Sequence, residues 1–252
     1  METKHSIILV LILIFSNYNS ANSQTIIALD TITNTKVEPF SQICKIETFR
    51  VRKFKKDRSF ESTGFFIAPN VILTAAHNLY SNKLTKVVKI KLLPGKYKDQ
   101  NSYDSIVING DELSKNVIRV HSKFNWNKVD FDFGIIIIPD SIINRLKNWP
   151  KVSSFNLDKT YNLKKGDTLR IAGFPANGGY DGSIMTYEAQ IGKDFSTKKI
   201  SHSFHTETGN SGSPLWIENG GKKIIIGIHT YTNLATRIDK EYIELIESWI
   251  NN

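Results

Sequence analysis

Short runs of alternating or continuous apolar residues follow one another along most of this chain, with a turn after each. Alternation with a period of two is typical of strands with one buried face, and a short continuous apolar run is typical of a fully buried strand. The pattern therefore predicts an all-β protein. The expected strands include residues 62–68, 71–74, 86–92, 105–108, 116–120 and 134–138, then 168–174, 187–191, 199–204, 214–217 and 223–228.

These strands fall into two groups, separated by residues 141–160, where Pro150, Ser153 and Ser154 interrupt the pattern. We expect this segment to connect two antiparallel barrels, over residues 39–140 and 161–252. The period changes at the end of the chain, and a terminal α-helix is expected with Asp239 as its N-cap. The residues that share one face of this helix are Tyr242, Ile243, Ile246, Trp249 and Ile250.

The N-terminus has the pattern of a secretory signal. Lys4 precedes an apolar run over 7–15 that is too short to span a membrane as a helix, and the small residues Ala21 to Ser23 suit a signal peptidase. We predict a signal peptide over 1–23 and a secreted protein, extracellular or periplasmic; an uncleaved membrane anchor is the alternative. Residues 24–38 are weakly patterned and are read as a propeptide or an N-terminal arm.

Chain length, hydrophobic content and the single cysteine constrain the fold further. With 252 residues, 40% of them hydrophobic, the chain can bury a sizeable core. Cys44 is the only cysteine, so no internal disulfide can form, and its alternating surroundings predict a buried, inert thiol.

The net charge is +9, with a local cluster of cations between Arg50 and Arg58. We interpret this cluster as a solvated, charged hairpin, since no nucleic-acid-binding motif accompanies it. A basic surface that holds an anionic polymer is the alternative.

The most informative segment is Gly209-Asn210-Ser211-Gly212-Ser213-Pro214. Small residues let the backbone turn sharply there, so that several N–H groups can point to one place. A serine nucleophile needs such donors, because negative charge develops on the carbonyl oxygen that it attacks. Ser211 is the candidate nucleophile, and the N–H groups of Gly209 and Ser211 are the candidate oxyanion hole.

Two upstream segments supply the partners that a serine needs. His77 follows the small residues Thr74-Ala75-Ala76, and imidazole is the base suited to neutral pH. Asp132 directly precedes the apolar run 134–138, where a carboxylate needs a partner and His77 would supply one. Asp130 is the rival, because residues two apart share a face of an extended strand. We prefer Asp132, which directly abuts the buried run.

These three segments, in the order His, Asp, Ser, resemble those of the chymotrypsin-fold serine proteases. The form of the serine segment, the later Gly227-Ile228-His229 and the lack of disulfides are similar to the glutamyl endopeptidase branch. The resemblance implies two six-stranded β-barrels with a C-terminal helix, and peptide hydrolysis by His77, Asp132 and Ser211. It also implies that Thr206 and His229 bind a glutamate side chain before the scissile bond, although a structural role for His229 is equally open.

The resemblance implies a protein or peptide substrate. We expect no metal, because His and Cys show no metal-ligand spacing, and no cofactor. We also expect no nucleic acid, no membrane after signal cleavage, since no second long apolar run follows, and a monomer. Two features depart from the family pattern: Tyr231-Thr232-Asn233 follow His229 where small residues are usual, and Glu207 lies close to the expected pocket. A non-catalytic binding protein on the same fold is the alternative function.

Overall fold

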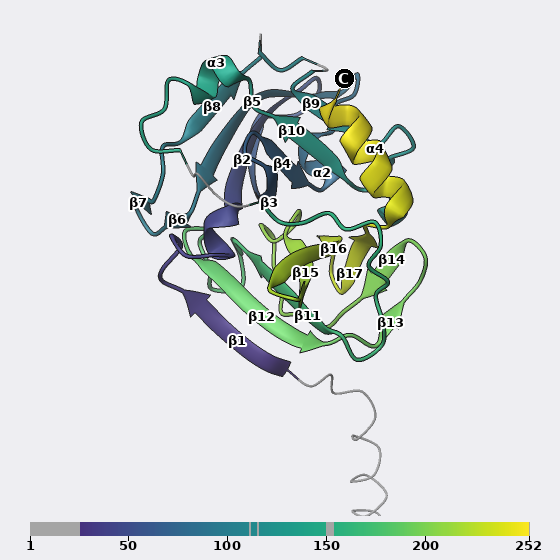
Figure 1. The fold of residues 1–252 in the computed structure, drawn as a ribbon. Helices are drawn as coiled ribbons and strands as arrows, with labels where there is room; N and C mark the ends of the chain where they lie inside the picture. The colour runs from purple at the N-terminus through teal and green to yellow at the C-terminus, as the bar shows by residue number, and fades with distance from the viewer. Residues whose placement is uncertain (1–25, 111, 115, 150–153, 252) are drawn as a thin grey trace, which may run out of the picture.

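The computed structural model describes residues 26–110, 112–114, 116–149 and 154–251. The predicted signal peptide over 1–23 lies outside these residues, as do Pro150 and Ser153 of the expected connection. Two curled antiparallel sheets are packed one above the other (Figure 1), which confirms the all-β class and the two-barrel arrangement. In the described residues the sheets have seven and eight strands, where the resemblance implied six in each.

The sheet of the first lobe has the strand order β8-β5-β2-β3-β4-β10-β9. Strand β10 lies between two neighbours and is almost wholly buried, which explains its uninterrupted apolar sequence. The bounds are β2 Ile43–Arg52, β3 Arg58–Ala68, β4 Val71–Thr74, β5 Thr85–Pro94, β8 Ile106–Asn109, β9 Ile118–Val120 and β10 Gly134–Ile137, with a separate ribbon of β6 Lys96–Tyr97 and β7 Gln100–Asn101.

The sheet of the second lobe has the order β1-β12-β11-β15-β16-β17-β14-β13. Its edge strand β1 comes from the segment interpreted as a propeptide or arm, and it pairs with β12 along most of its length. The bounds are β1 Ile26–Ile32, β11 Thr168–Gly173, β12 Met185–Ile191, β13 Asp194–Phe195, β14 Lys199–Ser201, β15 Pro214–Asn219, β16 Lys222–Tyr231 and β17 Leu234–Arg237.

The terminal helix α4, Lys240–Ile250, begins where the sequence predicts, because the Asp239 side chain accepts a hydrogen bond from the Tyr242 N–H at 3.1 Å. It follows the second lobe in sequence but lies beside β9 and β10 of the first (Figure 1), with the Tyr242 and Phe133 rings 4.6 Å apart. The helix therefore ties the two lobes together. The remaining helical segments are short: η1 Phe40–Gln42, α2 Ala76–Leu79, η2 Val129–Phe131 and α3 Asp140–Ile143.

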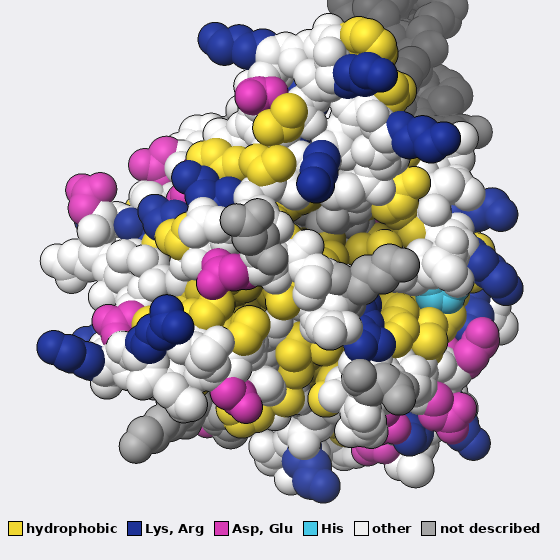
Figure 2. Space-filling model, turned by 90° about the horizontal axis from the view of Figure 1, so that it is seen from above, with side chains coloured by type: hydrophobic (Ala, Val, Ile, Leu, Met, Phe, Trp, Pro, Cys, Tyr) yellow, Lys and Arg dark blue, Asp and Glu magenta, His cyan; other side chains and the backbone are white. Residues whose placement is uncertain are grey.

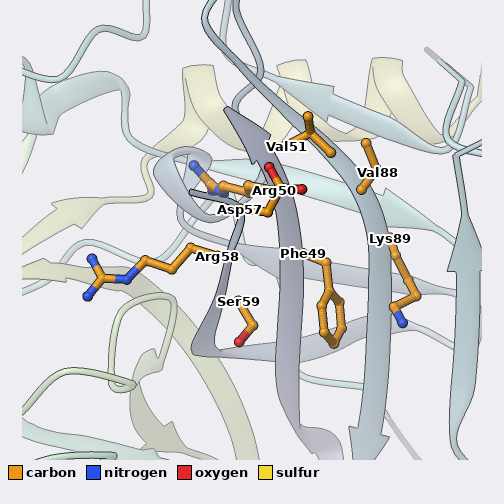
Figure 3. Close-up of a pocket in the computed structure, with 8 residues that line it drawn as sticks. All are labelled: Phe49, Arg50, Val51, Asp57, Arg58, Ser59, Val88 and Lys89. Carbon is orange, nitrogen blue, oxygen red and sulfur yellow. The ribbon is translucent and has the colours of Figure 1, made fainter. Parts of the chain in front are cut away.

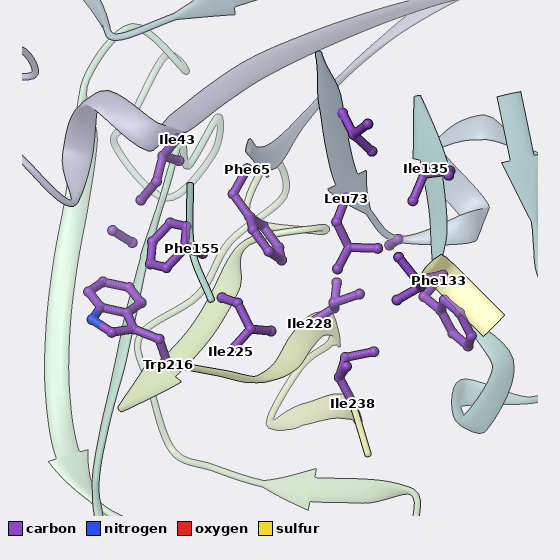
Figure 4. Packing of buried hydrophobic residues seen from close by; sticks show 14 of the residues in the cluster. Ile43, Phe65, Leu73, Phe133, Ile135, Phe155, Trp216, Ile225, Ile228 and Ile238 are labelled. Atoms are coloured by element: carbon purple, nitrogen blue, oxygen red, sulfur yellow. The ribbon is translucent and has the colours of Figure 1, made fainter. Parts of the chain in front are cut away.

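One apolar core runs through both lobes (Figure 4). Phe155, from the connecting segment, lies 5.6 Å from the ring of Phe65 in the first lobe and 5.5 Å from Trp216 in the second. Cys44 is fully buried at the first sheet, and burial raises the pKa of its thiol, as expected for an inert cysteine.

No helix of the described residues combines the length and the apolar character that crossing a bilayer requires. Lys and Arg side chains are spread over the face seen in Figure 2, with acidic side chains among them.

Thr63, a fully buried residue of β3, makes three hydrogen bonds to the second lobe. Its hydroxyl donates to the Gly209 carbonyl at 2.8 Å and accepts from the Phe174 N–H at 3.0 Å, and its own N–H donates to the Ser211 carbonyl at 2.9 Å. One threonine therefore holds the serine segment of the second lobe against the first.

We predict that Thr63→Val lowers the free energy of unfolding by about 2–4 kcal/mol, because it leaves the Gly209 carbonyl and the Phe174 N–H buried without partners. Denaturant unfolding measures the change. Thr48→Val is the matched control, since the Thr48 hydroxyl is equally buried but has no hydrogen-bond partner among the described residues. Equal losses in the two variants would contradict the role given to Thr63.

Candidate active site

His77 and Asp132 form a two-point contact. The Asp132 carboxylate accepts from the His77 backbone N–H at 2.9 Å and lies 2.7 Å from the ring Nδ1. His77 can approach so closely because Ala75 and Ala76 before it are small and fully buried, and α2 turns the chain directly after β4. Asp132 is itself fully buried, so this contact satisfies a carboxylate that water does not reach. The arrangement fixes the ring orientation and the tautomer with the proton on Nδ1.

Asp130 lies elsewhere. The expectation that it shares a strand face with Asp132 is wrong, because residues 129–131 form the 3₁₀ turn η2 rather than an extended strand. The Asp130 carboxylate pairs with Lys199 at 3.1 Å. The structure brings only Asp132, of these two acids, to His77.

Ser211 lies in a turn whose backbone requires glycine at positions 209 and 212. Gly209 and Gly212 have φ angles of +99° and +90°, and a Cβ on Gly212 would lie 2.0 Å from the Thr63 carbonyl oxygen. The Ser211 carbonyl accepts from the Asn78 side chain at 3.0 Å as well as from Thr63. Among the hydrogen bonds of the described chain, the N–H groups of Gly209 and Ser211 reach no protein acceptor.

The Ser211 hydroxyl and the His77 ring line one cleft of about 330 Å³ between the lobes. The hydroxyl donates to the Thr230 carbonyl at 3.4 Å, a long hydrogen bond, rather than to His77. Rotation about the Cα–Cβ bond of Ser211 changes which acceptor it faces. Catalytic hydrogen bonds are often long before a substrate binds, so this geometry is compatible with a serine and base pair.

Thr206 and His229 line the same cleft, on the side of the second lobe. His229 is backed by His202, a residue that the sequence analysis did not single out, with His202 Nε2 3.1 Å from His229 Nδ1. Burial lowers the pKa of His202 to about 4, and burial together with the neighbouring His202 and His77 lowers the pKa of His229 well below its usual value. Both rings are therefore neutral at pH 7. The sequence signal for His202 was a histidine within an apolar alternation.

The two residues flagged as departures from the family pattern also lie at the cleft. Tyr231 reaches across it, and its hydroxyl donates to the Trp126 carbonyl of the first lobe at 3.1 Å. The rings of Tyr231 and Trp126 lie 6.0 and 6.3 Å from that of His77, so they cover its exposed side. The Glu207 carboxylate packs next to Gly178 at the rim.

Arg50 is a second residue that the sequence analysis misplaced. It was grouped with the solvated cations, but only 6% of it is exposed, because strand alternation turns it inward while Val51 points out. Its guanidinium donates to the His77 carbonyl at 2.6 Å and lies over the Phe60 ring. Arg50 therefore supports the turn that carries His77.

Comparisons with known proteins give the same architecture. A structure described as Glu endopeptidase in complex with MPD superposes with a TM-score of 0.66 at 20% identity, over 92% of this chain and 99% of that one. The protease Anisep from Arthrobacter nicotinovorans gives a TM-score of 0.59 at 12% identity, over 83% and 92% of the two chains. A thermostable serine protease, AL20, from an extremophilic microorganism gives 0.56 at 13% identity, over 78% and 90%.

The fold is thus that of the chymotrypsin-like serine proteases. The family model described as trypsin matches residues 44–247, and the chain belongs to that family.

A curated relative, named extracellular metalloprotease, from Bacillus subtilis (strain 168), is 24% identical over 201 residues, which cover 77% of this chain. The match spans 59% of that relative's length. Within the described ranges of this chain, no group of three or more His, Cys, Asp or Glu side chains is placed to hold a metal ion.

We predict that the free energy of unfolding falls as the pH is lowered from 6.5 towards 4. Unfolded histidine binds its proton near pH 6.5, whereas His202 in the folded protein does so only near pH 4, so the unfolded state holds more protons in this window. His202 alone contributes about 1.4 kcal/mol per pH unit. Denaturant titrations at pH 7, 6 and 5 measure the slope.

His202→Gln should make this pH dependence shallower, because it removes the buried imidazole whose pKa is lowered. An unaltered slope in His202→Gln would show that the buried pair does not control it.

Proposed function

We propose that this protein is a secreted serine endopeptidase in which Ser211, His77 and Asp132 form the catalytic triad. His77 takes the proton of the Ser211 hydroxyl through Nε2 as the serine oxygen attacks the peptide carbonyl, and then gives that proton to the leaving amine. Asp132 keeps Nδ1 protonated and stabilises the imidazolium. The Gly209 and Ser211 N–H groups bind the oxyanion, and water then hydrolyses the acyl-enzyme by the same steps.

The observation that carries this proposal is the buried, two-point contact between Asp132 and His77, in one cleft with Ser211. A merely structural aspartate would not need to hold both the backbone and the ring of a histidine that opens into a cleft. The predicted signal peptide supports secretion, with cleavage after Ser23, and agrees with the name of the curated extracellular relative.

Asp132→Asn should lower kcat/KM for a peptide substrate by about 10⁴-fold, the magnitude known for triad enzymes, because the amide favours the wrong tautomer of His77. Asp130→Asn, which removes a carboxylate two residues away, should retain most of the activity. Steady-state kinetics on the purified protein measures both. Similar losses in the two variants would remove Asp132 from the triad.

A fluorophosphonate probe separates an enzyme from a binding protein on the same fold. The probe should label the parent protein and not Ser211→Ala, with the adduct on Ser211 by mass spectrometry. A folded parent that resists labelling and hydrolyses no peptide would favour the non-catalytic alternative.

We further propose that the enzyme prefers glutamate before the scissile bond, and that Thr206 and His229 bind the carboxylate of this glutamate. Two features support this: both residues line the cleft beside Ser211, and a glutamyl endopeptidase shares the fold. His202 occupies Nδ1 of His229, which leaves Nε2 for a substrate. A hydroxyl and an imidazole N–H can both donate to a carboxylate, and the entering negative charge favours protonation of the otherwise neutral ring.

In a peptide library, cleavage should follow glutamate, and Thr206→Val or His229→Gln should reduce kcat/KM for glutamate substrates by about 10-fold or more, as expected for the loss of a charge-assisted hydrogen bond. The matched glutamine substrate should be much less affected. An equal loss for both substrates would assign these residues a structural role and leave the protease assignment intact.

A further inference from the structure

The β2–β3 hairpin and the turn before β5 meet at one end of the first lobe. The Lys53 N–H donates to the Leu84 carbonyl at 3.0 Å, and Arg52 pairs with Thr85 across the β2–β5 ladder. We call residues 51–58 and 81–86 together the hairpin tip. Its two segments are therefore held side by side by backbone hydrogen bonds.

Charge is concentrated at and around this tip. Segments 49–60 and 81–89 contain one acidic residue, Asp57, and nine of the chain's 33 Lys and Arg, in a protein whose net charge is +9. Apart from the inward-facing Arg50, these cations lie on the surface. Six of them are exposed and have no ion pair with any described residue: Lys53, Lys55, Lys56, Arg58, Lys83 and Lys86.

Large apolar side chains are exposed among these cations. Phe54 is 77% exposed, Leu84 56% and Val51 45%. A single exposed apolar residue needs no explanation, but here three lie on the two segments that form the hairpin tip. Val51 also lines a hollow of about 460 Å³ on the first sheet (Figure 3), where the Lys89 ammonium lies 4.0 Å from the centre of the Phe49 ring.

We propose that the hairpin tip docks the protein on an anionic lipid surface. Lysine and arginine are attracted to acidic headgroups, and Phe54 and Leu84 enter the boundary between headgroups and acyl chains. A soluble polyanion would satisfy the cations but offers no apolar phase for Phe54, Leu84 and Val51. This inference does not depend on the proposed catalysis, and it differs from the expectation of no membrane after signal cleavage.

Sedimentation with phosphatidylcholine vesicles that contain 30% phosphatidylglycerol tests the proposal. The chain used starts at Gln24, which leaves out the apolar run at 7–15 and keeps both sheets complete. It should bind these vesicles, more weakly as salt is added, and should not bind pure phosphatidylcholine. Lys53→Gln/Lys55→Gln/Lys56→Gln should weaken binding roughly 100-fold. The control, Lys164→Gln/Lys165→Gln/Lys222→Gln, removes the same charge from exposed lysines of the second lobe and should change binding far less.

Insertion is tested separately from charge. Phe54→Ser/Leu84→Ser should weaken vesicle binding by about 10-fold or more without changing hydrolysis of a soluble peptide. Vesicles with brominated acyl chains should quench the tryptophan fluorescence of Phe54→Trp more strongly than that of the parent protein, because the added indole enters the acyl-chain boundary.

Three outcomes would overturn the proposal: no binding to the acidic vesicles, equal losses in the two lysine triple variants, or binding that is insensitive to Phe54→Ser/Leu84→Ser. If vesicle binding is insensitive to Phe54→Ser/Leu84→Ser and the protein also binds polyphosphate or RNA, the hairpin tip is a polyanion site instead.

Discussion

The site depends on the hydrogen bonds that hold the serine segment against the first lobe. Thr63 donates to the carbonyls of Gly209 and Ser211, and Asn78, one residue after His77, also donates to the Ser211 carbonyl. The segment that carries the serine is therefore positioned by the lobe that carries the histidine and the aspartate. A cleft assembled from two lobes needs such a connection, because catalytic geometry tolerates errors of only about 0.5 Å.

Several polar groups that are buried at the cleft are held by hydrogen bonds to neighbouring groups. Asp132 has no access to water and is satisfied by His77, whose carbonyl is in turn held by Arg50. His229 and His202 are buried as neutral rings, and one hydrogen bond joins His202 Nε2 to His229 Nδ1. The two rings that face the cleft, His77 and His229, thus each have a partner behind them, which restricts their orientation before a ligand arrives.

Much of the fold could be predicted from local pattern. The strand segments, the two groups of strands, and the helix with its Asp239 cap all follow from periodicity and capping chemistry, which act over a few residues. The local rule failed at Asp130, where a 3₁₀ turn replaced the expected extended strand, and at Arg50, whose inward orientation depends on the register of β2 against its neighbours. The pairing of β1 with β12 joins residues more than 150 positions apart, and no local pattern encodes it.

The sequence by itself determined the all-β class, the residue types available for acyl transfer, and the glycines whose positive φ angles shape the serine turn. Only the tertiary structure decided which aspartate meets His77, that His202 lies behind His229, and that Tyr231 closes the cleft against Trp126. The physical reason is the distance along the chain over which each interaction acts. Propensity and periodicity act between near neighbours in sequence, whereas each of these contacts forms only when distant strands pack and exclude water from the groups between them.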